Sequence, residues 1–358
     1  MKTAVVILNY NTSDYLKKFL PGLMASCEGL DARVIVADNA SKDGSAQMLQ
    51  EEFPQVPLIR LEENYGFTGG YNRALAQLEA EYYLLINSDI EVPEGWLQPL
   101  VAWMDSHPDC GACGPKLLDY ARRDTFEYAG AAGGLLDRYG YPFCRGRILQ
   151  KVEKDHGQYD TPANVLWVSG ACLLVRAGVW KALGGLDDRF FCHMEEIDLC
   201  WRMQLQGWKV TLVPESFVYH IGGGTLPNES PFKLRLNFRN NLLLLENNLP
   251  ATFMAQMAEQ AGHDVMPGPD RASAERHARA KARRRILTRM CLDGCSALVY
   301  LVTRRRIFYQ AVLQAHKEYR QLRRAGDIPE RPHKPEGLYK GWIVPKGLFE
   351  KNSIFVKI

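Results

Sequence analysis

The chain has 358 residues, of which 46% are hydrophobic and 24% charged, with a net charge of +3. This length suits one large domain with an appendage, or two domains, and the hydrophobic content excludes general disorder. Met1 to Leu8 has neither the basic start nor the cleavage site of a signal peptide, so we expect none. The nine cysteines are expected to be reduced thiols, and the apolar stretch around Cys110 and Cys113 favours core packing over a redox or zinc site.

Strand and helix patterns alternate in the first half of the chain. Short apolar runs predict four buried strands, at Thr3–Leu8, Arg33–Ala37, Leu58–Leu61 and Tyr82–Ile86. Helical patterns separate them, after a cap at Thr12 or Ser13, at 44–53 and near Tyr71–Leu78. This rhythm favours a parallel, doubly wound α/β sheet.

A second block, from about residue 110 to 226, is richer in glycine and aromatic residues and less regular. Further strands are expected at Leu166–Val175, Lys209–Val213 and Phe217–His220. The chain becomes helical from about residue 232, and residues 257–285 have the composition of a polar linker or insertion. Ile286–Val302 is apolar enough to raise the question of a membrane span. Because it contains Arg289 and Asp293, an amphipathic helix is favoured over a spanning one.

The C-terminal part of the chain carries most of its excess positive charge. Residues 271–324 contain 15 Lys or Arg and three Asp or Glu, which leaves 29 basic and 38 acidic residues elsewhere. A basic module of this kind usually faces an anionic surface or ligand. Either its helices pack on the rest of the protein and show a solvated basic face, or that face rests on an anionic membrane leaflet. Nucleic acid is disfavoured, because no aromatic residue interrupts the basic stretch before Tyr300.

The most informative feature is the end of the fourth strand, Leu-Leu-Ile-Asn-Ser-Asp at 84–89. Ligands of open α/β sheets bind outside the carboxyl ends of the strands. Asp89 could hold a divalent cation there, together with the phosphates of a nucleotide diphosphate. The alternative is that Asp89 only caps the next turn.

Two other strand ends carry polar or glycine-rich segments. Asp38, in Asp-Asn-Ala-Ser at 38–41, could accept a hydrogen bond from the imide of a pyrimidine base, although Asp-Asn is also a common turn sequence. Asn64–Gly70 contains three glycines before a helix, which would let the backbone approach an anionic ligand. A merely tight turn is the alternative reading of this segment.

Residues 194–202 and 220–225 are the remaining candidates for chemistry. Glu195, Glu196 and Asp198 lie in the first turn of a predicted helix, where acids complement the helix dipole. Three acids in four residues exceed that need, and one could be the base that deprotonates a hydroxyl nucleophile. His220 precedes three glycines and could ligate a metal, although a single histidine at a strand end is more often structural.

Taken together and in this order, these segments resemble the inverting family 2 glycosyltransferases of the GT-A fold, most closely the bacterial branch with rhamnosyltransferases for cell-surface polysaccharides. The resemblance covers roughly residues 3–245. The matching segments are Val-Ile-Leu-Asn-Tyr-Asn (6–11), Val-Ala-Asp-Asn-Ala-Ser (36–41), Glu-Asn-Tyr-Gly-Phe-Thr-Gly-Gly-Tyr-Asn (63–72), Leu-Ile-Asn-Ser-Asp (85–89), Val-Ser-Gly-Ala-Cys-Leu-Leu-Val-Arg (168–176), Gly-Gly-Leu-Asp-Asp-Arg-Phe-Phe (184–191), Glu-Glu-Ile-Asp-Leu-Cys-Trp-Arg (195–202) and His-Ile-Gly-Gly-Gly (220–224).

The resemblance implies roles for individual residues. Asp89 would be the metal-binding acid and His220 the distal metal ligand or phosphate contact. Asp38 would read the pyrimidine, with Asn9, Asn11 and Ser41 nearby, and Asn64, Gly69, Gly70 and Asn72 would line the nucleotide-sugar. The family usually has Glu-Asp where this chain has Glu195-Glu196. Glu196 takes the role of base by position, and Glu195 and Asp198 stay open as alternatives.

The implied fold is α/β, a GT-A (Rossmann-like, doubly wound mixed sheet) domain over residues 1–245 with a helical C-terminal extension over 246–358. Residues 1–110 would bind the nucleotide and residues 111–245 the acceptor. The implied reaction moves a sugar from dTDP-rhamnose or a UDP-sugar, with Mg²⁺ or Mn²⁺, to a glycan or polyprenyl-linked acceptor with inversion. The expected location is the cytoplasm, with peripheral docking on the inner face of the membrane.

Two other functions fit less well. A nucleotidyltransferase would need a basic glycine-rich loop near the N-terminus, and Val5–Asn11 has none. The main alternative is a non-catalytic nucleotide-sugar or glycan-binding protein that retains the fold. The acids at 195–198 argue against it, and an assay of sugar-donor hydrolysis distinguishes the two.

Overall fold

A computed structural model of the chain describes residues 1–222, 230–262 and 268–349. Its main sheet has nine strands, eight of them in the order β11-β13-β6-β12-β4-β1-β2-β3, with β5 paired to β13. The strands are β1 (Thr3–Asn9), β2 (Ala32–Asp38), β3 (Leu58–Arg60), β4 (Tyr82–Ile86), β5 (Ile90–Glu91), β6 (Cys110–Asp119), β11 (Ala163–Asn164), β12 (Cys172–Arg176) and β13 (Lys209–His220).

Strand directions divide this sheet into two halves. β3, β2, β1 and β4 are mutually parallel, as the alternating sequence pattern predicts. β12 then runs antiparallel to both β4 and β6, whereas β13 runs parallel to β6. The sheet is therefore mixed, and the GT-A-like α/β architecture expected from the resemblance is confirmed.

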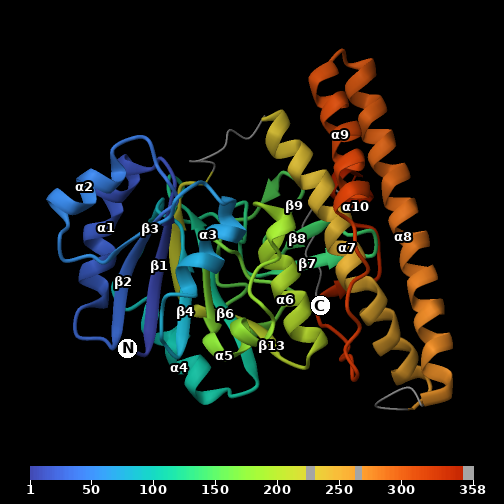
Figure 1. Ribbon diagram of the computed structural model, residues 1–358, viewed down its shortest axis with the longest axis horizontal. Helices are drawn as coiled ribbons and strands as arrows, with labels where there is room; N and C mark the ends of the chain where they lie inside the picture. Colours follow the sequence, from blue (N-terminus) through green and yellow to red (C-terminus); the bar gives the residue numbers. More distant parts are fainter. Residues whose placement is uncertain (223–229, 263–267, 350–358) are drawn as a thin grey trace.

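Helices cover both faces of the sheet (Figure 1). One buried cluster joins the sheet to α1 (Ser13–Cys27), α2 (Ser45–Glu52) and α4 (Leu97–Ser106). The other joins it to α3 (Gly66–Leu75), α5 (Ala177–Ala182) and α6 (Glu195–Leu205). The central strands are buried on both faces, which explains why they read as continuous apolar runs rather than as alternating patterns.

A smaller sheet of five strands lies beside the main one, in the order β10-β9-β8-β7-β14. Its strands are β7 (Gly134–Asp137), β8 (Pro142–Cys144), β9 (Arg147–Ile148), β10 (Lys151–Val152) and β14 (Leu338–Tyr339). Two further short elements are the 3-10 helix η1 (Asp188–Phe190) and the helix α10 (Ile343–Phe349). The expected strand over Leu166–Val175 is regular only from Cys172 onward.

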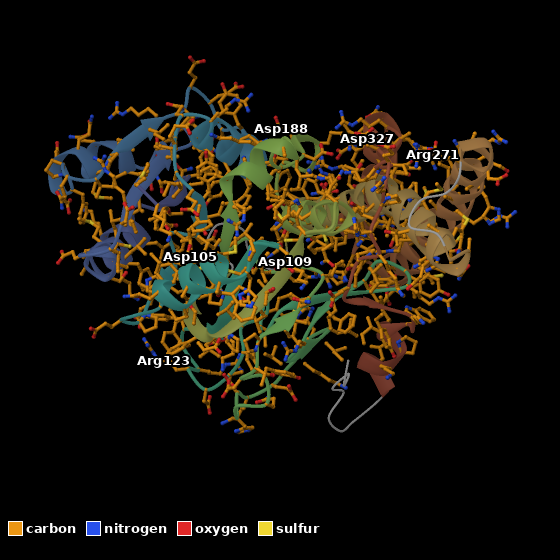
Figure 2. All side chains as sticks on the ribbon, turned by 90° about the horizontal axis from the view of Figure 1, so that it is seen from below. Asp105, Asp109, Arg123, Asp188, Arg271 and Asp327 are labelled. Carbon is orange, nitrogen blue, oxygen red and sulfur yellow. The ribbon has the colours of Figure 1, made fainter. Side chains whose placement is uncertain are left out.

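Three long helices follow the main sheet: α7 (Pro231–Gln260), α8 (Gly268–Val302) and α9 (Arg306–Leu322). Figure 2, seen from below, shows this helical layer at the side of the molecule that carries Arg271 and Asp327, away from α1 and α2. The residues of α7 from Arg239 to Ala255 are buried, and leucines of this helix belong to the same core cluster as residues of α6. Helix α7 therefore crosses the expected boundary at 245–246 and packs into the same core as the main sheet.

The structure corrects the expected polar linker over 257–285. Residues 257–260 end α7, and residues 268–285 lie in α8. Ala274, Ala278, Ala282 and Ile286 recur every four residues and are buried against the neighbouring helices. Among the described helices, none is long and apolar enough to cross a membrane. Cys110 and Cys113 are buried free thiols, as core packing predicts.

Candidate active site

The ends of β1 and β2 bring together the first group of predicted residues. Asn9 and Asp38 are register partners at the last position of these parallel strands. The side-chain amide of Asn9 donates to Asp38 Oδ1 over 2.7 Å and to Ser41 Oγ over 3.0 Å. The backbone N–H of Ser41 donates to Asp38 Oδ2 over 3.2 Å. Both carboxylate oxygens of Asp38 are thus already engaged by the protein, and Asp38 is buried.

Asn11 closes this group from the loop after β1. Its backbone N–H donates to Ser41 Oγ over 3.0 Å, and its Oδ1 accepts from the backbone N–H of Lys42 over 2.7 Å. Asn11 itself has φ +55°, a left-handed conformation that asparagine tolerates better than most residues. Asn9, Asn11, Asp38 and Ser41 therefore form one connected polar rim at the carboxyl edge of the sheet.

The Asn64–Gly70 segment is joined to this rim through Asn39. The side-chain amide of Asn39 donates to Asn64 Oδ1 and to the carbonyl oxygen of Gly66, both over 3.0 Å. Gly70 has a packing reason to lack a side chain, because a Cβ there would lie 2.7 Å from Leu8. A Cβ at Gly69 would lie 2.9 Å from Tyr65. Gly70 thus lets helix α3 pack closely on β1.

Asn72 makes its contacts elsewhere. Its side-chain amide donates to the carbonyl oxygen of Leu186 and to Asp188 Oδ1, both over 2.8 Å. Its Oδ1 accepts from the backbone N–H of Leu186 over 2.9 Å. These contacts fasten α3 to the segment before α6, so Asn72 orders the site's framework.

Asp89 and His220 meet at the same edge, as the sequence predicts for a shared site. His220 ends β13 and is the register partner of Ile90, which follows Asp89 in the chain. Asp89 Oδ1 lies 3.2 Å from His220 Nε2. The other ring nitrogen, Nδ1, lies 3.5 Å from Glu127 Oε2. All three side chains are buried.

The two carboxylates control the charge of this imidazole. Burial opposes the protonated ring, but hydrogen bonds with Asp89 and Glu127 outweigh it and raise the pKa of His220 to about 10. The resulting Asp–His–Glu arrangement is a compact cluster of alternating charge. It lies at the carboxyl edge of the sheet, where ligands of open α/β sheets bind.

Glu195 and Glu196 begin α6 with buried, unpartnered oxygens. Among the described residues, neither Glu195 Oε2 nor Glu196 Oε2 has a hydrogen-bond partner. Burial, together with the charge of Glu196, raises the pKa of Glu195 well above its ordinary value. Burial raises the pKa of Glu196 to about 7. A carboxylate with such a pKa is suited to proton transfer near neutral pH.

Backbone contacts place Glu196 near the Asp89 loop. A Cβ on Gly170 would lie 3.4 Å from Glu196 Cβ, so the two residues are in close contact. The next residue, Ala171, accepts a hydrogen bond from the backbone N–H of Asn87 over 2.9 Å. Asn87 is two residues before Asp89. The strand end that carries Asp89 and the helix start that carries Glu196 are therefore neighbours across a single backbone segment.

Asp198 is held in a different way from the two glutamates. Its Oδ2 lies 2.6 Å from Arg202 Nε, and its Oδ1 accepts from the amides of Asn247 (2.9 Å) and Asn248 (2.8 Å). Asp198 is fully buried. These contacts make it a link between α6 and α7, with no free oxygen facing a substrate.

The turn before α6 is conformationally unusual. Phe191, His193 and Met194 all have positive φ, between +64° and +73°. Such values cost energy for residues other than glycine and persist only where surrounding contacts hold them. The side-chain amide of Asn240 on α7 supplies three of these contacts, donating to the carbonyl oxygens of Phe190 (2.9 Å), Cys192 (2.8 Å) and His193 (2.7 Å).

Comparison with known proteins agrees with this geometry. Residues 4–171 match the sequence profile described as Glycosyl transferase family 2. The chain is 30% identical over 234 residues to an N-acetylglucosaminyl-diphospho-decaprenol L-rhamnosyltransferase of Mycobacterium tuberculosis, covering 60% of this chain and 75% of that protein. The chain belongs to glycosyl transferase family 2.

Two further similarities support the assignment. Rhamnosyltransferase WbbL of Escherichia coli K12 is 26% identical over 223 residues, which are 60% of this chain and 82% of that one. A crystal structure of GalNAc-T7 with UDP, GalNAc and Mn²⁺ matches with a TM-score of 0.53 and 15% identity, over 83% of this chain and 57% of that chain. The latter shows a shared fold.

The residues at the sheet edge fit a divalent cation in part. Asp89 and His220 offer one carboxylate and one imidazole side by side. Within the described ranges, no group of three or more His, Cys, Asp or Glu could hold a metal ion by itself. This set suits an ion that takes its other ligands from substrate phosphates and water, as Mg²⁺ commonly does.

Several site residues of this glycosyltransferase are not evident from the sequence. Glu127 lies in the irregular block and carries no strand-end signal, yet its backbone N–H donates to Leu117 O and brings its side chain to His220. Asn240 lies in a helix that reads as an extension. Burial, with a smaller contribution from Lys233 near the start of α7, lowers the pKa of His193 to about 4.

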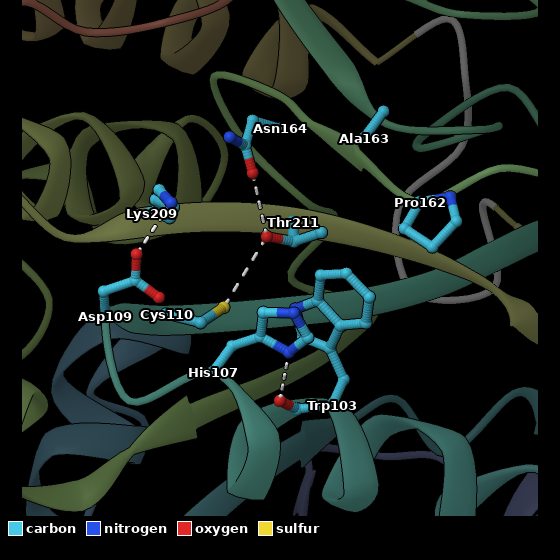
Figure 3. A pocket seen from close by; sticks show the side chains of 9 residues that line it. All are labelled: Trp103, His107, Asp109, Cys110, Pro162, Ala163, Asn164, Lys209 and Thr211. Carbon is cyan, nitrogen blue, oxygen red and sulfur yellow. Dashed lines mark hydrogen bonds and ion pairs between the residues drawn. The ribbon is translucent and has the colours of Figure 1, made fainter.

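A surface pocket lies at the other end of the sheet and takes no part in this site (Figure 3). It surrounds the starts of β6 and β13, where Lys209 pairs with Asp109 over 2.7 Å. His220 ends the same strand that Lys209 begins. Burial raises the pKa of the Cys110 thiol, which disfavours a nucleophilic thiolate there.

Proposed function

We propose that this family 2 glycosyltransferase moves a sugar from a nucleoside diphosphate to a hydroxyl group of a lipid-linked or glycan acceptor, with inversion. The observation that carries the proposal is the pair of glutamates at the start of α6, each with a buried, unpartnered Oε2, with Glu196 at a pKa of about 7, beside the Asp89 loop. A non-catalytic binding protein has no need for unpaired buried carboxylates, which are costly to keep.

The polar rim of Asn9, Asp38 and Ser41 is proposed to bind the nucleoside. Asp38 would accept from the imide N–H of uracil or thymine, while Asn9 and Ser41 hold its carboxylate in place. Adenine offers an acceptor at the corresponding ring nitrogen and would be rejected. Pyrimidine sugar nucleotides, dTDP-rhamnose first and UDP-hexoses second, are therefore the proposed sugar donors.

The proposed chemistry is a single in-line displacement at the anomeric carbon. Glu196 removes the proton from the acceptor hydroxyl as its oxygen attacks, and the bond to the diphosphate breaks on the opposite face. His220, whose two ring nitrogens face Asp89 and Glu127, would hold the Asp89 carboxylate in place beside the departing phosphate. A divalent cation held by Asp89 would offset the negative charge that develops on the leaving group. No covalent intermediate with the enzyme is required.

The acceptor is proposed to be carried on a polyprenyl diphosphate. The mycobacterial relative, named for an acceptor on diphospho-decaprenol, supports this class. Such an acceptor lies at a bilayer surface, so a protein without a span among its described helices must reach it by peripheral docking. The proposed setting is polysaccharide synthesis at the inner face of the cytoplasmic membrane.

The test is a panel of nucleotide sugars scored by release of nucleoside diphosphate, with and without a polyprenyl-diphosphate sugar acceptor. We expect acceptor-dependent release from a dTDP- or UDP-sugar and at most slow hydrolysis without the acceptor. Glu196→Gln is the matched control for chemistry, since it preserves size and removes the base. Binding of a nucleotide sugar with no turnover on any acceptor would instead favour the binding-protein alternative.

A further inference from the structure

The turn between α8 and α9 is the most exposed apolar region of the described chain. Leu298, Val299, Leu301, Val302 and Ile307 have exposed fractions of 58%, 60%, 43%, 75% and 65%. From 298 to 307 every residue except Tyr300 is exposed. We call residues 298–307 the hairpin tip. Large aliphatic side chains gathered at one projecting point are unusual on a protein that meets only water.

Positive charge surrounds these apolar side chains. Arg304 and Arg305 lie in the turn, and Arg306 begins α9. No Asp or Glu occurs between Asp293 and Glu318. Tyr300 and Phe308 stack with ring centroids 5.6 Å apart, and the Arg305 guanidinium lies 4.2 Å from the Phe308 ring centroid. Apolar, aromatic and basic side chains without acids form the combination that binds the interface of an anionic bilayer.

The hairpin tip lies at the same end of the molecule as the carboxyl ends of β1 and β2. In Figure 1 the N-terminus and the start of β1 lie at the bottom, whereas the turn between α8 and α9 lies at the top. The carboxyl ends of β1 and β2, with Asn9 and Asp38, therefore face the same end of the molecule as the tip. A surface that the tip contacts would lie on the side where the candidate active site opens.

We propose that the hairpin tip docks this protein on an anionic phospholipid bilayer by inserting its apolar side chains among the headgroups, while Arg304 and Arg306 contact lipid phosphates. The value of this orientation for catalysis rests on the proposed lipid-borne acceptor. A second copy of the chain is a poorer occupant, because a symmetric contact would bring two arginine triplets together without an acid to offset them.

Helices α7 and α9 anchor the tip to the catalytic body. Glu318 on α9 lies 3.0 Å from Arg235 and 3.4 Å from Arg239, both on α7. Arg239 in turn donates to the carbonyl oxygen of Phe190 over 2.7 Å. The tip is thus connected through packed helices to the turn before Glu195, so docking would orient the site as one body.

The experiment measures co-sedimentation of the full chain with phosphatidylglycerol vesicles and with phosphatidylcholine vesicles. We expect binding to the former, weakened by high salt, and little binding to the latter. Arg304→Gln with Arg306→Gln should weaken binding about 25-fold, at about fivefold for each arginine. Val302→Asp with Ile307→Asp should weaken it by at least tenfold. Both pairs are exposed, so the fold should be retained and checked by circular dichroism.

The matched control is Arg276→Gln with Arg284→Gln. These exposed arginines lie on α8, the helix that ends at Val302. Arg284 is about 27 Å along this helix from Val302, so salt screens its charge from a bilayer at the hairpin tip. The control should bind vesicles nearly as well as the parent. Equal loss in the control and the tip variants, or no binding to either vesicle, would overturn the proposal. The proposal would also be overturned if the parent is a dimer in solution and the variant Val302→Asp with Ile307→Asp is a monomer.

Vesicle binding is measured without substrate, and the tip variants should keep sugar-donor hydrolysis or transfer to a detergent-solubilised acceptor. Failure of the proposed enzyme activity would appear as inactivity of the parent in solution. Failure of the docking proposal would appear as a parent protein that is active in solution but does not bind the vesicles. The two results are therefore distinguishable.

Discussion

The side-chain amide of Asn240 donates to the backbone carbonyl oxygen of His193 over 2.7 Å. This hydrogen bond ties α7 to the turn that leads into Glu195 and Glu196. His193 has φ +71°, so the turn is held in a conformation that it would leave if the contact were lost. Helix α7 thus sets the position of the proposed base from 44 residues further along the chain.

We predict that Asn240→Ala lowers kcat much more than it changes the affinity for nucleoside diphosphate. Three carbonyl oxygens lose a buried partner, which should cost about 1–3 kcal/mol of stability. As the turn relaxes, water reaches Glu196, and the apparent pKa of kcat should fall from about 7 toward its ordinary value. The kcat–pH profile separates this positioning role from a loss of folded protein.

Asn237→Ala is the control for that variant. Asn237 lies one turn earlier on α7, and its amide donates to the carbonyl oxygen of Lys233 in the same helix, over 3.0 Å. It should leave both kcat and its pH dependence close to those of the parent. A pKa of kcat that is unchanged in Asn240→Ala would refute the positioning role.

The second prediction concerns the pH dependence of turnover. Glu196 must be ionised to act as a base, and its pKa is raised to about 7. We expect kcat to be low below pH 6, to rise through about pH 7, and to level above it. Glu196→Gln should lower kcat by about 10²-fold or more and abolish this rise. A larger loss in Glu195→Gln would transfer the role of base to Glu195.

The free energy of unfolding should fall as the pH rises, whereas turnover should increase, because both depend on the same carboxyl groups. Burial raises the pKa of Glu195 and Glu196 above the ordinary value of 4.5, so folding disfavours their ionised forms. The parent should therefore lose stability as the pH rises from about 4.5 through 7 and above. Glu195→Gln with Glu196→Gln removes this penalty. The variant should melt higher than the parent at pH 8 and close to it at pH 5, as measured by calorimetry.

The sequence predicts which polar residues gather at the carboxyl edge of the sheet, because these residues stand at or soon after the ends of short buried strands. Asn9 and Asp38 each follow an apolar run directly, and Asp89 comes three residues after the end of β4. Strands that run parallel bring these ends to one edge. That signal depends only on local pattern and on general topology. It needs no knowledge of distant contacts.

The remaining features depend on long-range contacts that no local pattern encodes. Asp198 looks like a third candidate base until Asn247 and Asn248, some 50 residues later, engage its carboxylate. Glu127 reaches His220 only through the folding of an irregular segment. The helix over residues 268–285, in contrast, has a local signal in the sequence. Ala274, Ala278 and Ala282 are spaced four residues apart, which is typical of a helix face, but the polar residues between them obscure this pattern.

The fourth prediction is that Asp38→Ala weakens both UDP binding and the fold. Asp38 accepts from Asn9 and from the Ser41 N–H, so its loss leaves buried donors without partners. We expect a loss of about 1.5–3 kcal/mol in nucleotide affinity, for one charge-assisted hydrogen bond, and a lower melting temperature. Calorimetric titration with UDP, dTDP and ADP tests the base preference. Equal affinity of variant and parent for UDP would remove Asp38 from the site.

The last prediction concerns Asp89, whose carboxylate lies 3.2 Å from His220 Nε2 and next to the proposed diphosphate position. Asp89→Ala should abolish the increase in UDP or dTDP affinity that Mn²⁺ gives the parent, while leaving metal-free binding nearly unchanged. Removing the metal with a chelator should bring the parent to the level of the variant. The control is Asp109→Ala, which removes an exposed acid at the far end of the sheet. Mn²⁺ should raise the nucleotide affinity of this variant as it does for the parent. If Mn²⁺ tightens nucleotide binding equally in parent and Asp89→Ala, the cation is held elsewhere, and Asp89 serves only to orient His220.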